Sequence, residues 1–101
     1  MQKRWYELSP DVCVVISRIE LAKETDRTRY ARLILWELHN AGYIPNQEIY
    51  MKRISSYEMK RWYDGNKTLF MAFEYLKDAD KNMQSDVALN VLRKIREEAV
   101  A

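Results

Sequence analysis

The chain has 101 residues, of which 48% are apolar and 32% charged, with two Gly, two Pro and a formal net charge of +2. This length suits one domain, which we expect to span residues 1–101, and the composition excludes disorder, collagen-like structure and a loop-dominated all-β fold. The nearly balanced charge gives no argument for a nucleic-acid or membrane partner.

Two similar segments, residues 3–40 and 60–97, align without a gap at an offset of 57 residues, and each begins with Lys-Arg-Trp-Tyr. In both segments apolar residues recur at the spacing of an amphipathic helix facing a core, twice in succession. The first segment places them at Val12, Val15, Ile16, Ile19 and Ala22, then at Tyr30, Ala31, Ile34, Leu35 and Leu38. The second segment places them at Leu69, Ala72, Phe73, Leu76 and Ala79, then at Val87, Ala88, Val91, Leu92 and Ile95. The pattern predicts an internal repeat of two helical hairpins.

Helix ends agree with this interpretation. Ser9 and Asn66 stand before the first helix of each segment, and Thr25 and Asn82 before the second, so these four residues are predicted N-caps. Between the segments, residues 41–59 contain Gly42, which is predicted to end the preceding helix, and an apolar pattern that predicts a linker helix. We therefore expect an all-α bundle of four to five helices, with two pseudo-repeated hairpins joined by a linker helix.

Candidate catalytic and metal-binding residues are scarce. The chain has one His, His39, and one Cys, Cys13, whereas a zinc site needs three or four such ligands. Cys13 is expected to be a small buried thiol, and two glycines provide no phosphate-binding loop. We expect a protein that is not an enzyme, has no cofactor and no metal, and has no membrane span. A single Cys suits a reducing compartment, so we expect a cytoplasmic protein.

The repeated Lys-Arg-Trp-Tyr is the most distinctive feature and has two interpretations. Aromatic rings can stack on unpaired bases while neighbouring cations hold phosphates, which would use Lys3, Arg4, Trp5, Lys60, Arg61 and Trp62. Alternatively, each motif fills the junction between a linker and its hairpin, with the cationic side chains lying over the rings. Because adjacent residues project in different directions, we do not expect Trp and Tyr of one motif to face one ligand.

A second lead comes from positions where the segments disagree. Leu33 and Trp36 of the first segment correspond to Asn90 and Arg93 of the second. This difference predicts that something covers Leu33 and Trp36, either the linker helix, through Ile49, Tyr50 or Ile54, or a partner chain. Trp is enriched at interface anchors.

The functional hypothesis is a non-catalytic protein–protein interaction module, an adaptor or a homodimer, that binds through Leu33, Trp36 and Tyr50. The alternative is a small nucleic-acid-binding protein that uses the repeated motifs.

Overall fold

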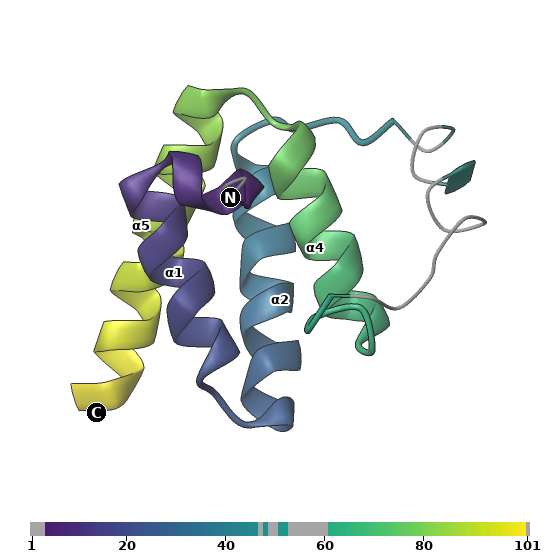
Figure 1. The fold of residues 1–101 in the computed structure, drawn as a ribbon. Coiled ribbons are helices and arrows are strands. Elements are labelled where there is room, and N and C mark those ends of the chain that lie inside the picture. Colours follow the sequence, from purple (N-terminus) through teal and green to yellow (C-terminus); the bar gives the residue numbers. More distant parts are fainter. Residues whose placement is uncertain (1–3, 47, 49–50, 53–60, 101) are drawn as a thin grey trace.

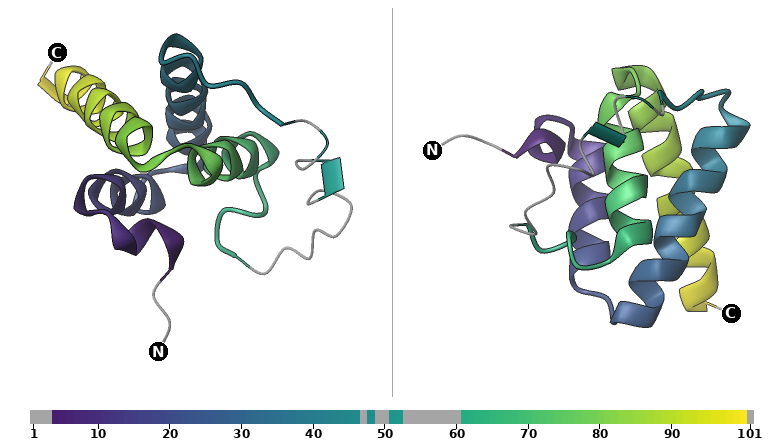
Figure 2. Two further views of the ribbon diagram at one scale, coloured as in Figure 1. Left: turned by 90° about the horizontal axis from the view of Figure 1, so that it is seen from above. Right: turned by 90° about the vertical axis from the view of Figure 1, so that its right-hand side faces the viewer.

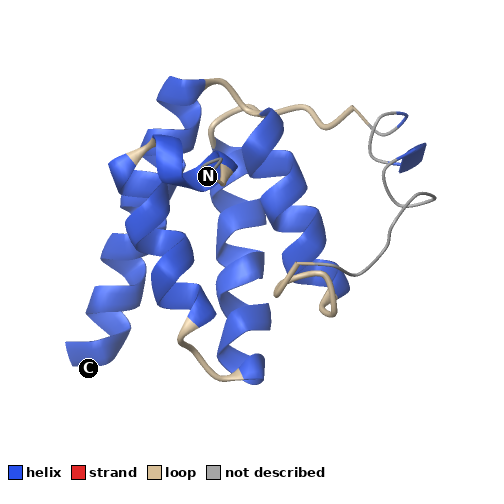
Figure 3. Ribbon diagram, in the orientation of Figure 1, coloured by secondary structure: helices blue, strands red, loops and turns tan. Residues whose placement is uncertain are grey.

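The computed structural model describes residues 4–46, 48, 51–52 and 61–100 of the chain. Over the described ranges, a short 3-10 helix, η1 (Trp5–Leu8), is followed by the α-helices α1 (Pro10–Glu20), α2 (Glu24–Asn40), α4 (Lys67–Asp78) and α5 (Lys81–Val100) (Figure 1). The described residues contain no strand (Figure 3). The protein is therefore a small all-α bundle, as predicted.

Equivalent helices begin at the offset of the sequence alignment. Pro10 opens α1 and Lys67 opens α4, while Glu24 opens α2 and Lys81 opens α5, so both pairs of starts are 57 residues apart. The two helices of each segment follow one another through a short turn. That the two segments arose by internal duplication stays a prediction.

The helices of one segment pack mainly on the helices of the other. The most extensive contacts join α2 with α4, α1 with α5 and α2 with α5, whereas α1 and α2 touch less (Figure 2). Exchanging the two segments converts the α1–α5 contact into the α4–α2 contact and leaves the α2–α5 contact unchanged. This is the pattern of a pseudo-twofold axis that passes between α2 and α5. The two helices of each predicted hairpin thus follow one another in the chain, but they pack mainly on the helices of the other hairpin and less on each other.

The core consists of the residues that the helical spacing selects. All of them are buried except Ala22, Tyr30 and Leu35, which are half-buried. The sequence pattern missed three further core residues, Tyr6, Tyr63 and Phe70. Two of these belong to the repeated motif, which therefore contributes to the core directly.

The caps are partly as predicted. Asn66 caps α4, because its Oδ1 accepts a hydrogen bond from the Leu69 amide at 3.1 Å. Ser9 occupies the N-cap position of α1, but its side chain bonds no amide of the first turn. Thr25 and Asn82 are wrong as caps, because α2 and α5 begin one residue before each of them.

The residue before α5, Asp80, provides the cap that was expected from Asn82. Its Oδ1 accepts a hydrogen bond from the Met83 amide at 2.9 Å. A carboxylate there also lies favourably at the positive end of the helix dipole.

Gly42 ends α2 as predicted. Its φ of +88° lies in the left-handed region that favours glycine. The next amide, that of Tyr43, donates to the Leu38 carbonyl at 2.9 Å, which closes the helix end in a Schellman arrangement. The predicted linker helix over residues 41–59 falls mostly outside the described residues, as do Ile49, Tyr50 and Ile54.

Phe73 provides a test of the core, because its side chain is fully buried and contacts rings from both segments. Phe73→Ala is expected to lower the free energy of unfolding by about 3–5 kcal/mol. Leu21→Ala is the control, since Leu21 is 88% exposed, and it should change this free energy by less than about 0.5 kcal/mol. Urea unfolding followed by circular dichroism measures both, and equal losses would contradict the core assignment.

Candidate functional site

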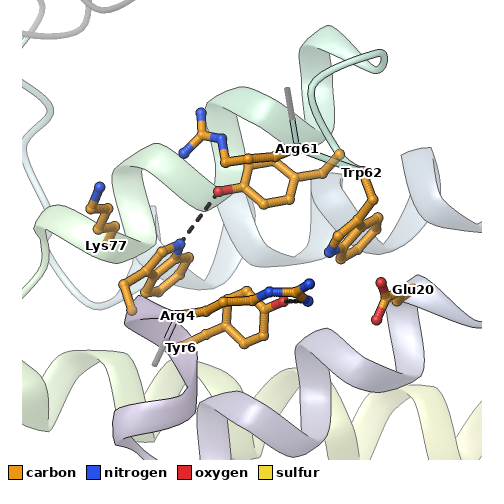
Figure 4. Close-up of a pocket in the computed structure, with 8 residues that line it drawn as sticks. Arg4, Tyr6, Glu20, Arg61, Trp62 and Lys77 are labelled. Carbon is orange, nitrogen blue, oxygen red and sulfur yellow. Dashed lines mark hydrogen bonds between the residues drawn. The ribbon is translucent and has the colours of Figure 1, made fainter. Parts of the chain in front are cut away.

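The Arg-Trp-Tyr residues of the two motifs meet at one cavity. Figure 2 shows η1 and the chain before α4 on the side of the bundle away from α2 and α5. The cavity there has a volume of about 460 Å³. Its lining consists of four pairs of residues at the offset of 57: Arg4 and Arg61, Trp5 and Trp62, Tyr6 and Tyr63, and Glu20 and Lys77 (Figure 4). We call it the axial cavity, because residues exchanged by the pseudo-twofold axis line it.

The walls of the axial cavity are aromatic. Within each motif the Trp and Tyr rings stand edge to face, with interplanar angles of 89° for Trp5–Tyr6 and 88° for Trp62–Tyr63. Both Trp rings also contact Phe73 of α4, at centroid distances of 6.4 and 5.7 Å. Trp and Tyr of one motif thus line the same cavity, while the expectation that they would not face one ligand stays a prediction. Their perpendicular rings form two adjoining walls of one cavity.

The hydrogen bonds in this cavity differ between the two motifs. Trp5 donates from Nε1 to the Tyr63 hydroxyl at 3.4 Å, which links the first segment to the second. The corresponding acceptor for Trp62, the Tyr6 hydroxyl, accepts instead from Arg4 Nη1 at 2.7 Å. Trp62 Nε1 is buried and has no acceptor among the described residues. An unmade hydrogen bond of this kind costs about 1–3 kcal/mol.

The two arginines of the motifs have different environments. Arg61 pairs with Asp64 at 3.0 Å and with Glu74 at 3.0 Å, and both carboxylates are 3% exposed. Its guanidinium also lies 4.6 Å from the centre of the Tyr63 ring. Arg4 is exposed and has no ion pair in the part of the chain that the structure describes. The charge of Arg61 is thus balanced by the carboxylates of Asp64 and Glu74, whereas Arg4 lines the cavity with a guanidinium that no carboxylate of the described residues pairs with.

This contrast predicts different costs for the same substitution at equivalent positions. Arg61→Gln removes the cation that pairs with two buried carboxylates and should lower the free energy of unfolding by about 2–3 kcal/mol. The loss stays below that of a fully buried ion pair because solvent reaches part of the Arg61 side chain. Arg4→Gln is the matched control and should cost much less. Equal losses in urea unfolding would show that the two arginines are equally engaged.

Tyr63 gives the fold a dependence on alkaline pH. Burial raises the pKa of its hydroxyl, and the hydrogen bond from Trp5 and the charge of Arg61 oppose this shift more weakly. The folded protein therefore keeps this proton to a higher pH than the unfolded chain. Stability from this group is complete below pH ~10 and is lost as the pH rises through the folded pKa.

Tyr63→Phe should remove this contribution. In urea unfolding at several pH values between about 9 and 11, the free energy of unfolding of the variant should fall less steeply than that of the unchanged protein. Tyr75, whose pKa burial also raises, offers the companion variant Tyr75→Phe. Identical slopes for the unchanged protein and Tyr63→Phe would contradict the assignment.

The structure describes four of the six residues proposed for nucleic-acid contact. Lys3 and Lys60 lie outside the described residues, while Arg4, Trp5, Arg61 and Trp62 surround the axial cavity. The two Trp side chains are partly buried against the core, and Arg61 is engaged by carboxylates. Nucleic-acid binding through this set stays a prediction, and Arg4 is the arginine of the set that has no ion pair in the described structure.

The residues proposed for protein contact lie elsewhere. Trp36 is 56% exposed on α2, with its ring 6.5 Å from that of His39, and Leu33 is half-buried on the same helix. Tyr50 lies outside the described residues. The counterpart of Leu33, Asn90, donates to Glu37 Oε2 at 3.3 Å. An internal hydrogen bond therefore explains the polar residue at this position of α5.

The residues considered for catalysis do not form a cluster in the described structure. Cys13 is half-buried rather than buried, and its sulfur lies 4.0 Å from the Ser17 hydroxyl, while His39 is exposed at the end of α2. Among residues 4–46, 48, 51–52 and 61–100, no three His, Cys, Asp or Glu side chains group as metal ligands would. Over the same residues, no helix combines the length and apolar character needed to cross a bilayer.

Comparison with known proteins gives no match to a protein family, a curated protein or a solved structure.

Proposed function

We propose that this protein is a non-catalytic protein–protein interaction module that binds through the outer surface of α2. The observation that carries the proposal is the exposure of Trp36, which leaves 56% of a large aromatic side chain in water. Trp is rare at such positions on a surface and common at the centre of interfaces, where its burial contributes strongly to affinity.

The neighbours of Trp36 indicate the chemistry of the partner. Residues three and four positions away share its face of the helix, which places Leu33 and Arg32 beside it. Arg32 is exposed and has no acidic partner within the described ranges. A partner with an apolar pocket next to a carboxylate would satisfy both the ring and the cation. A second copy of the chain or a different protein can supply this combination.

The comparison between segments suggests the variant that tests this proposal. The double variant Leu33→Asn, Trp36→Arg introduces the residues that α5 carries at the equivalent positions. Because Trp36 is mostly exposed, the change at this position should lower the free energy of unfolding by no more than about 1 kcal/mol. Association should be lost while the fold is kept. Leu21→Arg, at another exposed apolar residue, is the control and should associate normally.

Two measurements distinguish the possible partners. Sedimentation velocity over a wide concentration range detects a homodimer, which the double variant should abolish. Photo-crosslinking from position 36, compared with crosslinking from position 21, detects a different protein, which mass spectrometry then identifies. A monomer at all concentrations, combined with equal crosslinking from both positions, would overturn the proposal.

A further inference from the structure

The axial cavity has features of a small-molecule site that are independent of the α2 surface. Its volume of about 460 Å³ lies within the range of pockets that hold small ligands, roughly 300–1,000 Å³. Four aromatic rings and three cationic side chains line it, together with one carboxylate, that of Glu20. We propose that the axial cavity binds a small aromatic anion, with its ring between Trp5 and Trp62 and its carboxylate or phosphate on Arg4 and Trp62 Nε1.

The walls select a flat, apolar group. Trp5 and Tyr6 line the cavity from the first motif, and Trp62 and Tyr63 line it from the second. Aromatic rings prefer offset-stacked or edge-to-face partners, and a planar ring can meet both arrangements in such a box. A compact inorganic anion would leave these walls uncovered.

The polar groups select a negative charge. Trp62 Nε1 is a buried donor that lacks an acceptor, and Arg4 offers several further N–H donors from an exposed guanidinium. Lys77 at the rim is exposed as well and adds a third cationic or donor group. A carboxylate or phosphate accepts several such bonds at once, and bonds to charged donors are the stronger ones.

An organic cation is the competing ligand, since aromatic boxes commonly bind quaternary ammonium groups. Here Arg4 already lines the box, with its guanidinium 6.0 Å from the centre of the Tyr6 ring. A second cation would meet the charges of Arg4 and Lys77, against the single carboxylate of Glu20. The lining therefore disfavours a cation.

The difference between the two motifs locates the anion. Tyr63 accepts from Trp5, whereas the hydroxyl of Tyr6 accepts from Arg4 and Trp62 Nε1 has no acceptor among the described residues, although the carboxylate of Glu20 lies on the same side of the cavity (Figure 4). An anionic oxygen there would supply the missing acceptor for Trp62 and lie within reach of Arg4. The ligand would complete a hydrogen-bond pattern that the protein leaves unfinished.

The indole N–H signals of the three Trp residues provide the direct test. The uniformly ¹⁵N-labelled protein is titrated with 2-naphthoate, which carries a carboxylate, and separately with adenosine monophosphate, which carries a phosphate. The Trp62 indole signal should move to lower field as its hydrogen bond forms, while the Trp36 signal stays in place. The probe that causes this shift identifies the anionic group, and no shift with either probe overturns the proposal.

Neutral and cationic analogues test the role of charge. The amide 2-naphthamide and the cation phenyltrimethylammonium should bind at least about tenfold more weakly than 2-naphthoate. Equal or tighter binding of either analogue would contradict the anion site. A shift of all three indole signals together would identify non-specific association and would also overturn the proposal.

Matched variants separate a binding role from a structural one. Trp62→Phe keeps a ring but removes the orphan N–H, and Arg4→Gln removes the charge, so each should weaken 2-naphthoate binding about tenfold or more. Trp36→Phe and Arg32→Gln make the same changes on the α2 surface and should leave this affinity unchanged. Because the variants of one site do not touch the other, failure of this proposal leaves the protein-interaction proposal intact, and the reverse also holds.

Discussion

The structure depends on the burial of each helix of one segment against a helix of the other. A short amphipathic helix has little stability alone and forms because a partner covers its apolar face. Here α5 covers α1, α4 covers α2, and the contact between α2 and α5 joins these two pairs. Neither segment contains a complete core, so the 101-residue chain reaches the size of a stable domain only when both segments are folded together. The aromatic cluster around Phe73 belongs to the same arrangement, because its rings come from both segments.

A pseudo-twofold axis brings equivalent residues close together, which constrains their chemistry. Glu37 of α2 and Lys94 of α5 occupy the same position in the two segments and form an ion pair. Two identical charges at this position would repel, and because Glu37 is buried the repulsion would be strong. The axial cavity shows the same divergence, since its rim carries Glu20 from one segment and Lys77 from the other. The segments therefore carry opposite charges at these two pairs of positions, although the Arg-Trp-Tyr residues that line the same cavity are identical.

Helix periodicity was sufficient to predict the fold class and most of the core. Spacings such as that of Val12, Ile16 and Ile19 depend on one helix facing one core, which is information contained within a few turns of sequence. The caps at Thr25 and Asn82 were wrong by two residues, because the residues before α2 and α5 are Lys23 and Asp80, and the sequence pattern does not fix where a helix begins to that precision. Cys13 was predicted to be buried but is half-buried, since it lies at the edge of the apolar face of α1.

The axial cavity could not be predicted in this way. The motifs Arg4–Tyr6 and Arg61–Tyr63 are 57 residues apart, and their meeting follows from the way in which the segments pack on one another. The repeat itself was the available signal, because residues that two-fold-related segments place near the axis approach their own counterparts. The pairing of Arg61 with Glu74 also needed the structure, since Glu74 lies within α4, two turns beyond its first residue.

The interleaved packing has a consequence for assembly. Every major contact between α-helices joins the first segment to the second, so the same contacts can form whether the two segments belong to one chain or to two. Two chains that exchanged their second segments would form the same two bundles, with residues 41–60 as the crossing connection. Domain swapping of this kind would create no new interface between the segments. Within one chain, the connection keeps the two segments at a high effective concentration, and its length thereby sets the balance between a closed monomer and an exchanged dimer.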